Sequence, residues 1–140
     1  MLIKIQHVGI GVRDLDAMIH FYKDILGLPL EETLDWAALG LRAAVLPIGE
    51  VKLELIEAIS PQGEIAQDLA RLVEERGGGL HHLAFEVDDL DQTLRDLKQQ
   101  GVKLINETPL EAAGGRLAWV SGDATPGCMI ELVEKGYRIC

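Results

Sequence analysis

The sequence predicts an α+β fold of two tandem βαβββ modules, because one block of residues occurs twice with the same pattern. Residues 5–16 read IQHVGIGVRDLD and residues 80–91 read LHHLAFEVDDLD, so that His82 aligns with His7. Repetition of this kind indicates that one structural unit is used twice. At 140 residues the chain has the length of an ordinary domain and is 48% hydrophobic, so we expect a single domain over 1–140.

A second pair of matching segments lies near the end of each half. LELIE at 53–57 matches IELVE at 130–134, and the match aligns Glu54 with Glu131. Each half therefore carries one histidine near its start and one glutamate near its end.

Hydrophobic periodicity predicts the elements of each module. In the first half a strand precedes a helix that starts after Asp14 and stops at Gly27, and Asp89 and Gly101 mark the same start and stop in the second half. The expected strands are 3–12, 42–48, 51–57, 83–87, 102–106, 116–121 and 128–134. The expected organisation is module one over 1–58, a connecting helix over 60–77 that starts at Ser60-Pro61, and module two over 80–135.

Strand side chains alternate between two faces, and this alternation places the repeated polar residues away from the helices. The four polar residues on that face are His7, Glu54, His82 and Glu131. If the sheet curls around a shared cleft, two imidazoles and two carboxylates converge there and form a ligand set for a divalent metal ion. His81 has the other parity and is expected to be a packed or hydrogen-bonded core residue. Trp36 and Trp119 are expected to pack in the core rather than to line the cleft.

The composition excludes several classes of partner. A net charge of −10 and a pI near 4.7 argue against nucleic acid. The sequence has no apolar run of about 18 residues, so we expect no membrane span, and we also expect no signal peptide. Cys128 and Cys140 have neither a metal-binding nor a redox spacing, so we expect a reduced, cytoplasmic protein.

These motifs resemble the vicinal oxygen chelate superfamily, which includes glyoxalase I, extradiol dioxygenases, fosfomycin-resistance proteins and methylmalonyl-CoA epimerase. The likeness to the epimerases runs along almost the whole chain. It rests on QHVGIGVRDLD with FYKDILGL, on LPIGEVKLELIEAISP, on GGGLHHLAFEVDDLD and on GCMIELVE.

The resemblance implies that the metal ligands of the family fall on His7, Glu54, His82 and Glu131, with Co²⁺, Mn²⁺, Ni²⁺ or Zn²⁺ as the bound ion. It also implies interconversion of (2R)- and (2S)-methylmalonyl-CoA by proton transfer at C2. In that reaction the divalent ion stabilises an enolate, and Glu131 is one of the groups that remove or return the proton.

The sequence departs from the epimerase pattern in two places. Residues 36–49 (WAALGLRAAVLPIG) contain no carboxylate, and Arg42 stands about where the family carries a catalytic glutamate. Residues 119–127 (WVSGDATPG) replace an aromatic-Leu-His-Pro-Lys loop. The resemblance further implies an acyl-CoA thioester partner, whose phosphates Arg116, Arg42 and Lys103 are candidates to contact, and a homodimer.

Two other functions stay open. A glyoxalase-I-like lyase or isomerase acting on a thiol hemithioacetal uses a similar ligand set, although the HHLAFEVDDL stretch favours an epimerase. A non-catalytic, small-molecule-binding member of the superfamily is the other alternative, and the presence of all four ligands argues against it.

Overall fold

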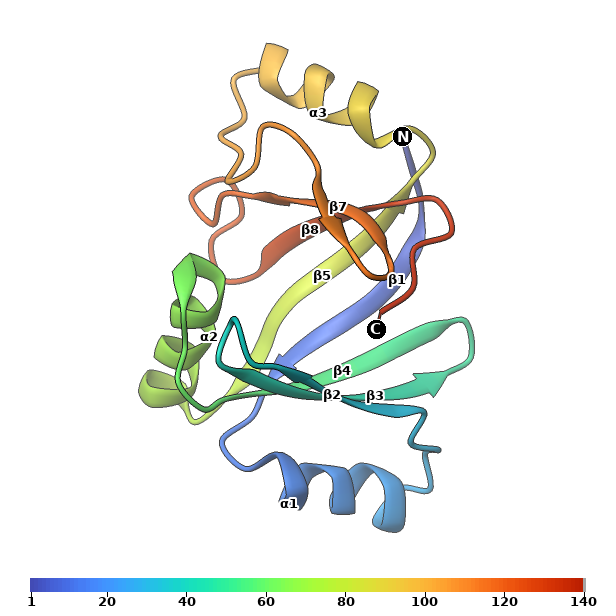
Figure 1. The fold of residues 1–140 in the computed structure, drawn as a ribbon, viewed down its shortest axis with the longest axis vertical. Coiled ribbons are helices and arrows are strands. Elements are labelled where there is room, and N and C mark those ends of the chain that lie inside the picture. The colour runs from blue at the N-terminus through green and yellow to red at the C-terminus, as the bar shows by residue number, and fades with distance from the viewer. Residues whose placement is uncertain (140) are drawn as a thin grey trace. The chain divides into compact units, whose positions relative to one another are not determined.

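The computed structural model describes residues 1–139 and has the order βαβββ twice, with a helix between the two sets (Figure 1). The strands are β1 (Leu2–Gly11), β2 (Glu32–Trp36), β3 (Leu41–Ile48), β4 (Val51–Ala58), β5 (Gly79–Val87), β6 (Leu110–Ala112), β7 (Gly115–Val120) and β8 (Met129–Glu134). The helices are α1 (Leu15–Ile19), which continues as the π-helical turn η1 (His20–Ile25), then α2 (Gly63–Arg76) and α3 (Leu90–Gln99). The predicted α+β fold is therefore confirmed. Cys140 lies outside the described residues.

The chain forms two compact units, and their boundary falls inside strands β1 and β5. The terminal unit holds Met1–His7 and His82–Cys140, and the central unit holds Val8–His81. These units differ from the two modules of the sequence repeat, because the first half of β1 belongs with the second module. The expected module boundaries stay a prediction.

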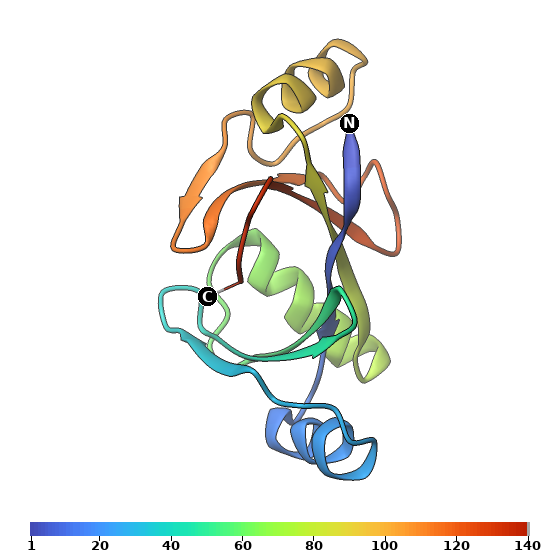
Figure 2. The ribbon, with the colours of Figure 1, turned by 90° about the vertical axis from the view of Figure 1, so that its right-hand side faces the viewer.

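In the central unit the strand order is β2-β3-β4-β1, and helices cover both faces of the strands (Figure 2). The α1 side holds a cluster of Val12, Leu15, Ala44, Leu46 and Leu55. The α2 side holds a second cluster of Leu41, Ala43, Ile56, Ala66 and Leu69. The connecting helix α2 therefore has a structural role, since its apolar side chains form part of the second cluster of the central unit.

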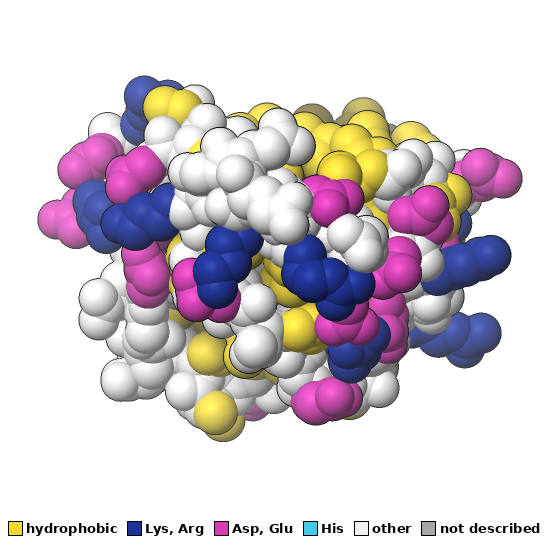
Figure 3. Space-filling model, turned by 90° about the horizontal axis from the view of Figure 1, so that it is seen from above, with side chains coloured by type: hydrophobic (Ala, Val, Ile, Leu, Met, Phe, Trp, Pro, Cys, Tyr) yellow, Lys and Arg dark blue, Asp and Glu magenta, His cyan; other side chains and the backbone are white. Residues whose placement is uncertain are grey.

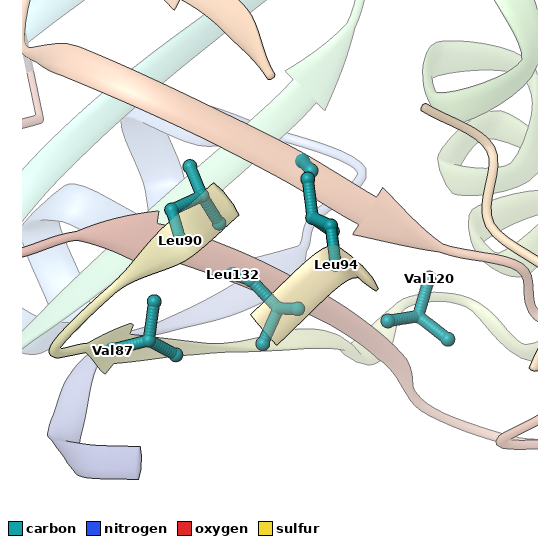
Figure 4. Packing of buried hydrophobic residues seen from close by; sticks show 6 residues of the cluster. Val87, Leu90, Leu94, Val120 and Leu132 are labelled. Carbon is teal, nitrogen blue, oxygen red and sulfur yellow. The ribbon is translucent and has the colours of Figure 1, made fainter. Parts of the chain in front are cut away.

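In the terminal unit the strand order is β1-β5-β8-β7-β6, with β5 and β8 parallel and β7 and β8 antiparallel. Helix α3 covers one face, where Val87, Leu90, Leu94, Val120 and Leu132 pack together (Figure 4). Burying each leucine of this cluster contributes about 1.5–3 kcal/mol to folding. The opposite face of these strands is therefore left for polar side chains.

The helix starts follow the predicted caps. The Asp14 carboxylate accepts from the Ala17 backbone N–H at 3.1 Å, and the Asp89 carboxylate accepts from that of Gln92 at 3.0 Å. Gly27 ends the first helix with a φ of 82°. The sequence did not indicate that the second half of this helix is wound as a π-helix.

Two predictions of secondary structure are wrong, one for a strand and one for the start of a helix. Segment 102–106 is not a strand: Leu104 makes one isolated bridge to Val120, and its apolar side chain packs against the α3 cluster. The apolar pattern there reflects helix packing. Helix α2 starts at Gly63 rather than at Ser60, because the Ser60 backbone N–H donates to the carbonyl of Gly40 and ties this segment to a turn.

Within residues 1–139, no helix is long and apolar enough to cross a membrane.

Candidate metal centre

The two histidines of the repeat meet inside the terminal unit. Strands β1 and β5 are neighbours and carry His7 and His82, whose Nε2 atoms lie 3.1 Å apart. Their rings pack edge to face with centroids 5.2 Å apart. Both residues are almost fully buried, at 1% and 2% exposure.

A carboxylate joins this pair from strand β8. The Oε1 atom of Glu131 lies 3.3 Å from Nε2 of His7, and Glu131 is 4% exposed. The parallel pairing of β5 with β8 sets Glu131 opposite Ala84, which lies two residues beyond His82 on the same face of β5. The strand register therefore brings together three of the four residues that the repeat predicts as ligands.

The ring of Trp119 also contacts this centre. On β7 it lies opposite Glu131, and its ring packs edge to face on His82 with centroids 4.9 Å apart. The expectation of core packing is confirmed for Trp36, which packs against the α2 cluster. It is wrong for Trp119, because pairing opposite Glu131 gives Trp119 the same facing as Glu131 and turns its ring toward His82.

Gln6 contacts the proposed ligand His7, and the sequence alone did not single it out. Its side-chain Oε1 contacts Nδ1 of His7, and its Nε2 donates to the backbone carbonyl of Tyr137 at 3.4 Å. A glutamine directly before a predicted ligand is the only signal in the sequence, and it does not reveal the contact with Tyr137.

The donor set of the terminal unit fits a divalent metal ion. An amide oxygen only accepts, so its contact with Nδ1 requires a proton there, and in the neutral imidazole the lone pair is then on Nε2. Two ligands with metal bonds of about 2.1 Å lie about 3.0 Å apart at right angles and about 3.4 Å apart at the tetrahedral angle, and the 3.1 and 3.3 Å found here fall in that range. A buried carboxylate beside ring nitrogens also needs a positive charge to offset its desolvation.

The fourth predicted ligand lies in the central unit. Glu54 on β4 is 3% exposed and stands opposite Val45 of β3. Leu53 and Leu55, its neighbours in the chain, pack on the α1 side, so Glu54 has the opposite facing. The predicted facing away from α1 is therefore confirmed, although Ile56, two residues further on the same face, packs in the α2 cluster.

The candidate CoA-binding arginines are engaged in ion pairs. Arg116 donates from Nε to Glu134 at 2.9 Å and from Nη2 to Asp91 at 3.0 Å. These bonds raise the pKa of Arg116 and lower the pKa of Asp91, whereas the pKa of Glu134 is lowered first by the backbone N–H of Arg116, at 2.9 Å, and then by the Arg116 side chain. On the face seen in Figure 3, basic side chains lie beside acidic ones in the same way.

Arg42 and Lys103 also lie near carboxylates. Arg42 is 3.8 Å from Asp16 and points to the α1 side, away from the facing of Glu54. Lys103 is 3.5 Å from Asp123. Contact of these basic residues with substrate stays a prediction.

His81 is buried, as its parity predicts. Its Nε2 lies 3.2 Å from Oδ2 of Asp68 on α2. The residue before His82 therefore pairs with the connecting helix.

The fold, together with the sequence, defines the class of protein: the chain belongs to the Glyoxalase/Bleomycin resistance protein/Dioxygenase superfamily, whose model matches residues 6–120. Among its relatives is the uncharacterized protein YqjC of Bacillus subtilis, which is 34% identical over 94% of this chain and 91% of its own. The crystal structure of methylmalonyl-CoA epimerase from Mycobacterium tuberculosis is 32% identical, with a TM-score of 0.82 over 95% of this chain and 88% of that one. A methylmalonyl-CoA epimerase in complex with methylmalonyl-CoA and NH4+ is 27% identical, with a TM-score of 0.83 over 99% and 100% of the two chains.

Proposed function

We propose that this protein is a divalent-metal-dependent epimerase that interconverts (2R)- and (2S)-methylmalonyl-CoA by moving the proton at C2. The observation that carries the proposal is the buried cluster of His7, His82 and Glu131 in a chain similar to these epimerases over nearly its whole length. The likeness to an epimerase in complex with methylmalonyl-CoA supports an acyl-CoA thioester as substrate.

Glu54 completes the proposed ligand set. It aligns with Glu131 in the sequence repeat, and burial of its carboxylate requires a compensating positive charge. Two imidazoles and two carboxylates suit Co²⁺, Mn²⁺, Ni²⁺ or Zn²⁺. When bound, such an ion supplies electrostatic stabilisation for the negative charge that develops on the thioester oxygen.

Glu131 is the proposed acid–base group on one face of the substrate. Its buried carboxylate is held beside His7, so it is fixed in place and shielded from water. Proton transfer by a positioned side chain contributes typically 10²–10⁴-fold to a rate, by order of magnitude. The ring of Trp119 packs on His82, so it borders the proposed site on the same side as Glu131.

Inversion at C2 requires a second acid, and the chain offers two candidates. Asp35 is exposed and stands opposite Arg42 in the β2–β3 register, which gives it the α1-side facing. Glu54 is buried and has the opposite facing. We therefore assign the second role to Glu54, in addition to its role as a ligand.

The proposed enzyme is a homodimer. Strands β2 and β6 end the strand order and are largely exposed, which supports association into a homodimer. A cytoplasmic location stays a prediction.

The test is proton NMR of Co²⁺-loaded protein with each epimer of methylmalonyl-CoA in D₂O. Deuterium exchange at C2 with interconversion of the epimers is the expected result. Tight metal binding without exchange would contradict the substrate assignment. Hemithioacetals of glutathione and other thiols would then test the glyoxalase-like alternative, and absence of turnover with both substrates would favour the small-molecule-binding alternative.

A further inference from the structure

We infer that Gln6 is a positioning residue: anchored by the backbone carbonyl of Tyr137, it fixes the tautomer of His7 and thereby directs the lone pair of Nε2 to the metal. This inference rests on the proposed metal site. Its test reads the histidine and the metal directly, so it does not depend on the substrate.

The orientation of the Gln6 side chain is set by the polarity of its two partners. Gln6 is buried, and its amide offers one accepting oxygen and one donating nitrogen. The carbonyl of Tyr137 can only accept, so it takes the nitrogen, at 3.4 Å. The oxygen is left toward Nδ1 of His7, which must then carry the proton.

The position of the Tyr137 carbonyl is in turn set by the C-terminal segment. The Tyr137 backbone N–H donates to the carbonyl of Glu134, and that of Arg138 donates to the carbonyl of Gly114, both at 3.0 Å. A Cβ atom on Gly114 would lie 1.4 Å from the carbonyl oxygen of Arg138. Only glycine at position 114 lets this segment pass so close, and the segment presents the carbonyl that anchors Gln6.

The consequence for metal binding follows from the lone pair. A metal ligand must offer an unprotonated nitrogen, and a partner on the other ring nitrogen fixes which one that is. Without Gln6, either nitrogen of His7 is free to hold the proton, and a proton on Nε2 competes directly with the metal. Removing such a partner typically weakens metal binding by about 10–100-fold.

The experiment compares Gln6→Leu with Gln6→Glu, and uses Gln99→Leu, an exposed position on α3, as the matched control. Long-range ¹H–¹⁵N NMR of the metal-free proteins reports the His7 tautomer, and Co²⁺ titration reports affinity. We expect a proton on Nδ1 in the wild type, in Gln6→Glu and in the control, and a shift toward Nε2 in Gln6→Leu with about 10–100-fold weaker Co²⁺ binding.

A second pair of variants tests the anchor from a distance. Gly114→Ala displaces the C-terminal segment and should move the tautomer in the same direction, whereas Gly122→Ala meets nothing within 4 Å and should not. An unchanged tautomer in Gln6→Leu, or a changed tautomer with unchanged Co²⁺ affinity, would overturn the inference. Should no epimerase activity be found, the tautomer and affinity results still decide it.

Discussion

The two histidines of the repeat occupy equivalent places but have different supports. His7 follows Gln6, which contacts its ring and reaches the C-terminal segment through Tyr137. His82 follows His81, which pairs with Asp68 on α2. The proposed ligands align between the two copies, whereas the residue before each of them contacts a different segment of the chain. We therefore expect the two supports to differ in effect: Gln6 acts on the metal, and His81 acts on folding.

The largest effects should come from the ligands themselves, where the two copies are alike. His7→Ala and His82→Ala each remove a ring nitrogen from the centre and should weaken Co²⁺ binding by more than about 100-fold, beyond the loss typical of a supporting residue. Isothermal titration measures the loss. His20→Ala, which removes an exposed histidine paired with Asp24, is the control. Equal affinity in wild type and either ligand variant would remove the basis of the metal site.

The next comparison separates the two glutamates. Glu131→Gln and Glu54→Gln should each slow epimer interconversion by about 10²–10⁴-fold, since each removes one acid–base group. Because the two groups serve opposite faces of C2, each variant should still exchange the C2 proton of one epimer, and the two variants should retain opposite epimers. NMR in D₂O with pure epimers measures both rates. Retention of the same epimer by both variants would contradict the two-sided assignment.

A smaller effect distinguishes the two supports. Asp68→Ala removes the partly exposed carboxylate that lies 3.2 Å from the buried His81 ring, and it should lower the free energy of unfolding by about 0.2–1 kcal/mol with Co²⁺ affinity unchanged. Gln6→Leu should show the opposite pattern, with a larger loss of Co²⁺ affinity than of the free energy of unfolding. Urea unfolding with parallel Co²⁺ titration measures both quantities. If Asp68→Ala weakens Co²⁺ binding as much as Gln6→Leu does, the supports do not differ in role.

The smallest effect concerns the ion pairs of Arg116, on the helix side of the terminal unit. The Arg116 side chain lowers the pKa of Asp91 below its ordinary value of 3.8, while the Arg116 backbone N–H, with the side chain second, lowers the pKa of Glu134 below its ordinary value of 4.5. A carboxyl with a lowered folded-state pKa adds stability above its ordinary value, and this stability is lost as the pH falls through the lowered one. Arg116→Met should therefore be slightly less stable than wild type at pH 7, and the difference should disappear below the ordinary carboxyl range.

Thermal unfolding of the two proteins across that pH range makes the measurement. A difference that is constant with pH would show that Arg116 contributes through packing and not through its ion pairs. Co²⁺ affinity should be the same in both proteins.

Much of the fold can be predicted from the sequence, because helix caps and strand alternation depend on residues that are close together in the chain. The caps Asp14 and Asp89 and the strand alternation around His82 depend on neighbouring residues alone, and the structure keeps them. The repeat also indicates which polar residues share a facing, since the strand period of two applies equally to both copies.

What the sequence does not reveal depends on register between distant segments. Trp119 turns toward His82 because β7 pairs with β8 opposite Glu131, and Gln6 is anchored by a carbonyl near the C-terminus. Neither contact leaves a trace in periodicity. The prediction of a strand at 102–106 was wrong for a related reason. The apolar side chains of this segment pack against the α3 cluster, and its backbone does not pair as a strand.

The proposed function requires that the four polar residues of the repeat hold one divalent metal ion. Crystals of Co²⁺-loaded protein, measured at the cobalt absorption edge, test it most directly. We expect a single anomalous peak within bonding distance of His7, Glu54, His82 and Glu131. A peak elsewhere, or a peak at the histidines with Glu54 turned away, would contradict it.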